Sequence, residues 1–298
     1  MPLSAYLAHV SLVALLVSSG FHLPTAAAQD VCTTQDQPNP IFSQYPGNAT
    51  GALNTTLAII PIPMAMARQI IPQQYAILEH AYRDLMPDFP VDMYPALVQA
   101  GHDHDIRFQN SGIPDFSRAG FEFPFLDILG DGSSLFRWAP EQMISAANLA
   151  AIQGSQAYGT EVHPSAFNPP CDAYAIHPNG RTYFNGTAGD KFMSLQMKRA
   201  NANEPFPCPI SLFENITNQP SLANGSTCDQ QIRLFNTSLT QVPFHPVPVR
   251  GTVKSNVGPF RCGMAFSNVA GFQVSTAFIE NNYLPCEMLR GYKFPTMI

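Results

Sequence analysis

The stretch that decides the fold runs from Tyr94 to Thr160 and reads YPALVQAGHDHDIRFQNSGIPDFSRAGFEFPFLDILGDGSSLFRWAPEQMISAANLAAIQGSQAYGT. Short apolar runs rich in Phe, Leu, Ile and Val alternate in it with polar segments, a pattern typical of successive β-strands. The same stretch carries two histidines, three arginines and the only tryptophan of the chain. We therefore expect it to supply most of the ionisable groups of any active site.

Outward from this stretch, the local patterns predict many short strands and few helices. Strands are predicted at Tyr94–Ala100, Phe121–Leu129, Ser134–Trp138, Leu149–Gln153, Ala173–His177, Phe192–Lys198, Val247–Val253 and Met264–Ile279. Helices are predicted at Met64–Ile71, Tyr75–Leu85 and Pro140–Asn148. With 28 prolines in the chain, this pattern favours a mainly β (α+β) fold, an antiparallel β-barrel or cone with a few peripheral helices.

The N-terminal segment has the features of a secretory signal. Leu7–Val17 is an apolar run too short for a permanent membrane span, and Ala26–Ala28 suits a cleavage site. The segment before the apolar run has no Lys or Arg, so an uncleaved anchor is the alternative. We predict a signal peptide over residues 1–28, an irregular glycosylated lead-in over 29–60 and a single β-barrel domain over 61–298.

Cysteines and glycosylation sequons both favour passage through the secretory pathway. The even number of cysteines predicts disulfides in an oxidising compartment, although their pairing is open: Cys32, Cys171, Cys208, Cys228, Cys262 and Cys286. Six asparagines stand in Asn-x-Ser/Thr sequons: Asn48, Asn54, Asn185, Asn215, Asn224 and Asn236. We expect an extracellular or vacuolar glycoprotein.

The composition limits the possible partners. Charged residues make up only 12% of the chain and the net charge is −6, so a basic footprint for nucleic acid is absent. No later apolar run reaches the length of a membrane span. The sequence therefore predicts a small-molecule substrate or ligand, no nucleic-acid partner and no stable membrane insertion, and it leaves the oligomeric state open.

His102 and His104 form an HxH pair at the end of a predicted strand. Strand alternation places both imidazoles on one face, where two nitrogens could bind a metal together with a third ligand. A cupin-like site would need a glutamate four or five residues further on, but Phe108 and Gln109 stand there. We expect no metal and no cofactor, and keep HxH metal binding as an alternative.

Glu122 and Arg137 are the other candidates for acid/base chemistry in the stretch. Glu122 lies between Phe121 and Phe123, so an inward side chain would lose its hydration and its pKa would rise toward that of a general acid. Strand alternation favours the opposite orientation, in which Glu122 points outward while both phenylalanines point inward. Arg137 could bind an anionic ligand or form a structural ion pair.

Familiar nucleophile and nucleotide motifs are missing from the sequence. The segment from Gly154 to Gly159 is not a GxSxG elbow, no lysine follows a serine at SxxK spacing, and no P-loop or GxGxxG is present. These absences argue against a serine hydrolase, a kinase or a dinucleotide-dependent oxidoreductase.

Three segments resemble the acetoacetate decarboxylase-like superfamily, in the form found in secreted fungal proteins. They are Ile70–Leu78 (IIPQQYAIL), similar to an early helix with a hydrophobic-Pro element; Ala96–Asp103 (ALVQAGHD), similar to the next strand; and Ala151–Gly159 (AIQGSQAYG), similar to a strand-Gly-x-x-x-Tyr-Pro segment. The resemblance spans residues 60–289 and implies a cone-like antiparallel barrel around a ligand cavity.

The chain departs from this superfamily at the catalytic lysine. In the decarboxylases a lysine pair follows the tyrosine-proline and one lysine forms a Schiff base; here Gly159, Thr160 and Glu161 follow Tyr158. The nearest downstream lysine is Lys191. The resemblance thus implies the fold without imine-based decarboxylation.

Together these features predict an enzyme of secondary metabolism that acts on a small, neutral carbonyl or polyketide-type compound by acid/base chemistry, as an isomerase, cyclase or lyase. His102 or His104 would be the base, Glu122 the acid, and Arg137 and Tyr158 would stabilise an enolate. The alternatives are a secreted hydrophobic-ligand-binding protein without turnover and a metal-dependent enzyme that uses the HxH pair.

Overall fold

The computed structural model describes residues 34, 36–109, 111–201, 205–224, 227–260 and 263–293. The predicted signal peptide, Cys32 and Cys262 lie outside these residues. The contacts group Val31–Ile298 into one compact unit. No helix in the described part of the chain combines the length and the hydrophobicity needed to cross a bilayer.

The fold is mainly β, as predicted, and is built on one 15-stranded sheet. Its strands are β1 (Ala49–Pro63), β2 (Ala76–Ile77), β3 (Met93–Phe108), β4 (Ser111–Ile113), β5 (Phe116–Asp127), β6 (Phe136–Trp138), β7 (Glu141–Ser145), β8 (Glu161–Asn168), β9 (Ala175–Ile176), β10 (Thr182–Ala188), β11 (Lys191–Arg199), β12 (Ser221–Leu222), β13 (Thr227–Leu234), β14 (Val247–Ser255) and β15 (Met264–Pro285). The helices are α1 (Met64–Ile70), α2 (Glu79–Leu85), α3 (Leu149–Ala157), α4 (Ile210–Thr217) and the 3-10 helix η1 (Cys286–Leu289).

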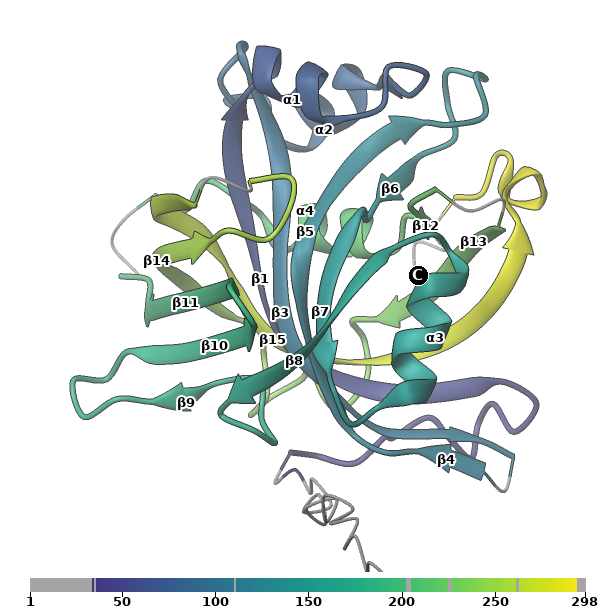
Figure 1. Cartoon of the computed structure of the whole chain (residues 1–298), viewed down its shortest axis with the longest axis vertical. Helices are drawn as coiled ribbons and strands as arrows, with labels where there is room; N and C mark the ends of the chain where they lie inside the picture. Colours follow the sequence, from purple (N-terminus) through teal and green to yellow (C-terminus); the bar gives the residue numbers. More distant parts are fainter. Residues whose placement is uncertain are drawn as a thin grey trace, which may run out of the picture. The chain divides into compact units, whose positions relative to one another are not determined.

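The sheet closes on itself twice. One ring of hydrogen-bonded neighbours, the apolar ring, runs β1–β3–β5–β7–β8–β10–β11–β14–β15 and returns to β1. The other, the polar ring, runs β1–β3–β5–β6–β12–β13–β15 and also returns to β1. Strands β15, β1, β3 and β5 belong to both, and Figure 1 shows β10, β11 and β14 on one side of them and β6, β12 and β13 on the other.

The long shared strands are buried on both faces because each face lines a different ring. In β3 every residue from Tyr94 to His104 is buried, and in β5 burial is nearly continuous. Alternation sends successive side chains to opposite faces. Thus Phe121 enters the apolar ring, whereas its neighbour Glu122 enters the polar ring.

The apolar ring is filled by the main hydrophobic core. Phe121 packs edge-on against Phe260, with ring centroids 4.7 Å apart, and the Phe123 ring lies 6.5 Å from the same side chain. Met143, Phe184, Met193, Leu195 and Val253 join this core and are all buried. An interior of this kind leaves little room for a polar ligand.

Several local predictions are confirmed. Phe123 pairs with Trp138 and Leu126 with Phe136, which gives the expected strand pair β5–β6. Gly130 and Gly132 both adopt positive φ in the turn between them, a conformation that costs glycine little. The strands predicted near residues 94, 192, 247 and 264 are β3, β11, β14 and β15.

Three local predictions differ from the structure. The helix predicted from Pro140 to Asn148 is instead strand β7, which pairs with both β5 and β8. Helix α3 then covers the predicted strand Leu149–Gln153, because the Asn148 side chain accepts a hydrogen bond from Ala151 N and caps the helix. The predicted irregular lead-in also differs, since its second half is part of β1, which pairs with β3 and β15 over most of its length.

The described cysteines include disulfide-bonded residues and one free thiol. Cys228 and Cys286 form a disulfide with a Cα–Cα separation of 5.1 Å. Cys171 is also disulfide-bonded. Cys208 is a buried free thiol, and burial raises its pKa to about 12.

Candidate active site

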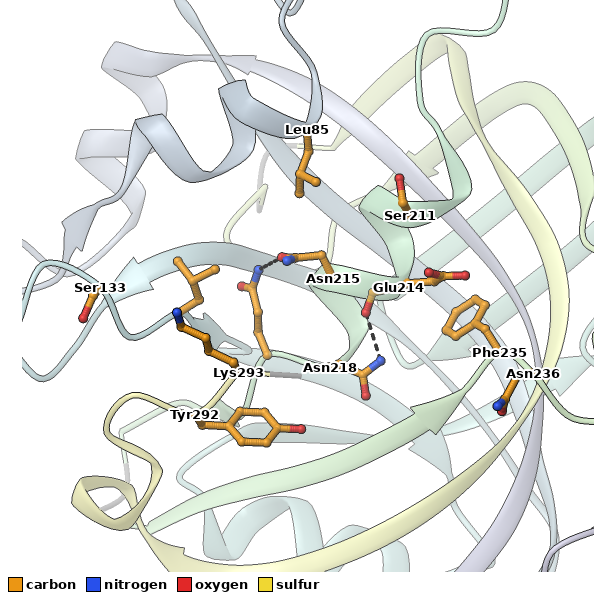
Figure 2. A pocket seen from close by; sticks show the side chains of 12 residues that line it. Leu85, Ser133, Ser211, Glu214, Asn215, Asn218, Phe235, Asn236, Tyr292 and Lys293 are labelled. Carbon is orange, nitrogen blue, oxygen red and sulfur yellow. Dashed lines mark hydrogen bonds between the residues drawn. The ribbon is translucent and has the colours of Figure 1, made fainter. Parts of the chain in front are cut away.

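The described part of the chain contains a large open groove on the outside of the barrel and a cavity that ends inside the polar ring. The groove, with a volume of about 630 Å³, is shown in Figure 2. It lies between Leu85 of α2, the exposed side of α4 and the segment at Tyr292 and Lys293. Within it, Gln219 Nε2 donates to Asn215 Oδ1 (2.9 Å), and Asn218 Nδ2 donates to the Glu214 carbonyl (2.9 Å).

The groove is poorly suited to acid/base catalysis. Its lining is mainly amide, hydroxyl and apolar, with Lys293 and Glu214 as charged side chains, and Glu214 forms no ion pair with any described residue. Asn215 and Asn236, both in predicted sequons, line it as well. Glycans on these asparagines would occupy part of this space.

The cavity has a volume of about 400 Å³ and an uneven lining. Its outer wall is largely apolar, with contributions from β3, β4, β5, α3 and β15: Ile106, Phe108, Ile113, Phe116, Ala151 and Phe278. Its floor is polar and comes from the polar ring: Asp103, Arg118, Tyr158, Asp229, Gln231 and Glu280. This arrangement suits a small molecule with an apolar body and a polar head.

A smaller chamber of about 50 Å³ adjoins the floor of the cavity. Arg118, Tyr158, Asp229 and Gln231 line both spaces. The chamber adds the deeper side chains of the polar ring, including Glu122, Arg137 and Arg233. Strand alternation explains this convergence, because Arg118 and Glu122 of β5, like Asp229, Gln231 and Arg233 of β13, are separated by even numbers of positions and so share one face of their strand.

Two buried ion pairs hold the walls of the polar ring together. Arg118 Nε lies 2.9 Å from Asp103 Oδ2, which joins β5 to β3. Arg137 Nη1 pairs with Glu122 Oε2, and Arg137 Nε also donates to the Gln219 carbonyl (2.7 Å). Each guanidinium is therefore matched by a carboxylate, as buried charges require.

Gln231 is the central connector of the network. Its Oε1 accepts hydrogen bonds from Arg118 Nη2 (3.1 Å) and from Arg233 Nε (3.0 Å), while its Nε2 donates to Glu280 Oε2 (2.9 Å). Arg233 also donates from Nη2 to Gln99 Oε1 (2.6 Å). A single amide thus links side chains from β5, β13 and β15.

Asp229 and Glu280 form a pair of carboxyl groups at the cavity floor. Their side chains are hydrogen-bonded to each other, and burial together with the Asp229 charge raises the pKa of Glu280 well above its ordinary value. Asp229 Oδ1 is buried and has no hydrogen-bond donor among the described N–H and hydroxyl groups. A proton held between the two carboxyls accounts for both observations.

The charge state of Glu122 differs from the expectation of a raised pKa. Burial does favour its neutral form, but Arg137, Arg233 and Arg118 together outweigh burial and lower the pKa. Glu122 is therefore held as an ionised partner of Arg137, in the structural role that was the alternative for Arg137. For Asp103 the balance is reversed, since burial raises its pKa more than Arg118 and Arg233 lower it.

Tyr158 stands at the boundary between cavity and chamber. Its hydroxyl donates to Asn282 Oδ1 (2.6 Å) and accepts from Tyr283 N (3.2 Å), and its ring stacks on Tyr283 with centroids 5.5 Å apart. Burial, then the nearby Asp229 charge, raises its pKa. The phenol therefore stays neutral and fixed in position.

His102 and His104 do not join this network, because both lie on the face of β3 opposite Asp103. Their rings stack with an interplanar angle of 15°, and His102 Nδ1 lies 2.9 Å from Ser117 Oγ. Burial, with a smaller contribution from His104, lowers the pKa of His102 to about 4. The structure thus brings Glu122, Arg137 and Tyr158 to one chamber and places both histidines elsewhere.

Among the described residues, no carboxylate, thiol or further imidazole lies close enough to the two histidines to complete a three-ligand metal site. The three-ligand group found in this part of the chain is Glu141, Glu161 and His163. There His163 Nε2 lies 3.1 Å from Glu141 Oε2, which also accepts a hydrogen bond from Gly258 N (2.8 Å). Glu141 Oε2 and His163 Nε2, the two atoms nearest each other, therefore already have hydrogen-bond partners.

The four lysines of the chain are all described, and the linings of the cavity and chamber include none of them. Lys191 begins β11, a strand of the apolar ring. The floor that sequence reasoning missed comes instead from Arg118, Gln231, Asp229 and Glu280. The signal that could have found two of these, Asp229 and Gln231, is the alternation of polar residues in Asp229-Gln230-Gln231-Ile232-Arg233, which is unusual for a buried strand.

Comparisons with known proteins give matches among solved structures alone, because no protein-family model and no curated protein matches the chain. One match is the enduracididine biosynthesis enzyme MppR with HEPES buffer bound, at 9% identity and TM-score 0.46, covering 80% of this chain and 86% of that one. Another is an acetoacetate decarboxylase-like enzyme from Sphingomonas wittichii RW1, at 7% identity and TM-score 0.41, covering 80% and 94%. The superfamily that the sequence resembles is thus among the matches. MppR in complex with the condensation product of pyruvate and imidazole 4-carboxaldehyde also matches, at 9% identity and TM-score 0.41, covering 79% and 87%.

Proposed function

We propose that the protein is a secreted or vacuolar enzyme that moves protons on a small, largely neutral carbonyl compound, as an isomerase, cyclase or lyase. The observation that supports this most directly is the floor of the 400 Å³ cavity, where the Asp229–Glu280 pair lies beside Arg118 and Tyr158. The apolar wall would bind the body of the substrate, and the polar floor would bind its carbonyl end.

The carboxyl pair has the properties that acid/base catalysis needs. Glu280, with its raised pKa, is suited to donate a proton, and Asp229 is the adjacent carboxyl that could accept one. Removal of a proton next to a carbonyl and its return at another carbon would be shared between them. Arg118, at the same floor, is placed to stabilise the negative charge that develops on the carbonyl oxygen.

The lysine-free linings favour this chemistry over an imine mechanism. A Schiff base needs an amine in the cavity, and the structure offers guanidiniums, carboxyls and a phenol. We therefore propose proton transfer in place of decarboxylation, because this chain lacks the lysines that follow the tyrosine in the decarboxylases.

Hydrogen–deuterium exchange at carbon tests the proposal, because proton removal next to a carbonyl is the step common to all three reaction types. The protein is incubated in D2O with a panel of small ketones and β-dicarbonyl compounds, and loss of the α-hydrogen signals is followed by NMR. We expect catalysed exchange with at least one class of compound, reduced about 100-fold or more in Glu280→Gln and in Asp229→Asn. His102→Gln, on the other face of β3, serves as the control and should retain exchange.

The rival function is binding without turnover, and the apolar cavity wall is the observation that favours it. The same experiment separates the two. Compounds that raise the melting temperature of the protein yet show no catalysed exchange or conversion would indicate a carrier or sensor for small hydrophobic ligands.

A further inference from the structure

Arg233 is a deeply buried charged side chain of the polar ring, at 1% exposure. Its two neighbouring guanidiniums each contact a carboxylate, Arg118 with Asp103 and Arg137 with Glu122. The hydrogen bonds of Arg233 go to the amide oxygens of Gln231 and Gln99 instead. It is a buried cation without a directly contacting anion among the described residues, an arrangement that is costly without a counter-ion.

One nitrogen of this guanidinium has no partner at all. Arg233 Nη1 is buried and makes no hydrogen bond with any described group, although Nε and Nη2 of the same side chain are both satisfied. Burial and repulsion by Arg118 and Arg137 lower the pKa of Arg233 to about 9. The side chain is thus still charged at neutral pH, and it retains an unused donor.

Empty space adjoins this side chain. The 50 Å³ chamber is lined by all three guanidiniums and by the hydroxyls of Tyr158, Thr160, Ser155 and Ser221. A single water needs about 10–15 Å³ of such space, so the chamber has room for one small anion and accompanying water. Two carboxylates also line it: Glu122 is paired with Arg137, and Asp229 is hydrogen-bonded to Glu280, whose pKa is raised by burial and by the Asp229 charge.

We propose that this chamber binds a small inorganic monovalent anion of the chloride class, with Arg233 as its principal ligand. The anion would satisfy Nη1 and balance the one guanidinium that has no carboxylate. It would enter through the larger cavity, since Arg118, Tyr158 and Gln231 line both spaces. The site shares Arg118, Tyr158, Asp229 and Gln231 with the floor of the cavity, and the anion itself takes no part in the proposed proton transfer.

Chloride titration at constant ionic strength tests the site, with sodium gluconate replacing sodium chloride. Because a ligand that binds the folded state stabilises it by mass action, the melting temperature should rise with chloride, by roughly 3–5 °C at about tenfold the Kd. Arg233→Gln should abolish the rise, and Arg233→Lys should retain a smaller one. Arg107→Gln, a half-exposed arginine at the cavity rim, should retain the full rise.

A crystal of the wild-type protein grown in sodium bromide gives an independent readout if Arg233→Gln fails to fold. We expect an anomalous peak within hydrogen-bond distance of Arg233 Nη1. The proposal is overturned if chloride and gluconate give equal melting temperatures in the wild type, if Arg233→Gln keeps the chloride-dependent rise, or if the chamber holds no bromide.

Discussion

The two rings of this barrel share four strands yet have opposite interiors. On one face of β5, Phe121 packs against Phe260 in a core of aromatic and aliphatic side chains. On the other face, Arg118 and Glu122 belong to a network of guanidiniums, carboxyls and amides. Both interiors are buried, so burial alone does not distinguish the apolar ring from the polar ring, which carries the candidate site. The comparison shows that the buried polar side chains, with empty space beside them, locate the candidate site.

The largest loss of stability should occur when one partner of a buried ion pair in the polar ring is removed. Glu122→Ala leaves Arg137 charged and buried beside the chamber, so we expect a loss of about 3–5 kcal/mol in the free energy of unfolding. Urea denaturation measures this loss. The exposed pair Arg290–Glu287 is the control, and Glu287→Ala should cost less than about 1 kcal/mol.

The double variant Glu122→Leu/Arg137→Met sharpens that test. Removing both charges leaves no buried ion without a partner, so this variant should be more stable than Glu122→Ala alone. A double variant that is as unstable as the single one would mean that packing, not the uncompensated charge, explains the loss.

His102, on the face of β3 opposite Asp103, should make the free energy of unfolding fall at acidic pH. Its pKa is about 4 in the folded protein, lowered by burial and then by His104, against 6.5 for an ordinary histidine. The unfolded chain therefore binds more protons between these pH values, and this contribution to stability, complete above pH 6.5, is lost as the pH falls to about 4, up to about 3 kcal/mol. The unfolding free energy of the wild type should fall relative to that of His102→Leu as the pH drops across this window. Parallel curves would contradict the lowered pKa, and His80→Leu in exposed α2 is the control.

A matched pair of substitutions compares the tolerance of the two interiors. Gln231→Leu removes the amide that bonds Arg118, Arg233 and Glu280 and should cost about 2 kcal/mol or more, because donors and an acceptor are left unsatisfied. Met193→Leu in the apolar ring conserves volume and should cost less than about 1.5 kcal/mol. Thermal or urea unfolding of both variants decides the comparison, and equal losses would refute the distinction between the rings.

The smallest expected effect on stability comes from α3, which forms part of the cavity wall. Gly154 lines the cavity and has nothing within 4 Å of the position of an added Cβ. Gly154→Leu should stabilise the helix by about 0.5–1 kcal/mol while it narrows the cavity. Ligand binding or hydrogen exchange should therefore fall although the melting temperature does not, and unchanged binding would show that the ligand occupies another space.

Elements that depend on neighbouring residues in the chain could in part be predicted from the sequence. The hairpin β5–β6 and the strand that carries His102 and Asp103 could be predicted from apolar runs, turn residues and alternation. Strand β7 and helix α3 could not, because Pro140 imitates a helix start while the cap that begins the helix is Asn148. Glu122, Arg137 and Tyr158 line one chamber without the two histidines, and the pKa of Glu122 depends on guanidiniums from β5, β6 and β13.

The candidate acid/base pair illustrates what sequence patterns do not contain. Asp229 and Glu280 are far apart in the chain, and the β13–β15 register, in which Gln231 pairs with Glu280, brings them together. Neither residue stands in a recognisable motif, and no nearby residue indicates that the two share a proton. Which face of a strand lines which ring also follows only from the double closure of the sheet.

Infrared spectroscopy of the Asp229–Glu280 pair tests the central claim most directly. In the difference spectrum between the wild-type protein and Glu280→Gln at neutral pH, the account predicts the C=O stretching band of a protonated carboxylic acid, present in the wild type and lost in the variant. If the wild type shows only ionised carboxylate bands at these positions, the two residues do not share a proton, and the proposed acid/base site in the polar ring is contradicted.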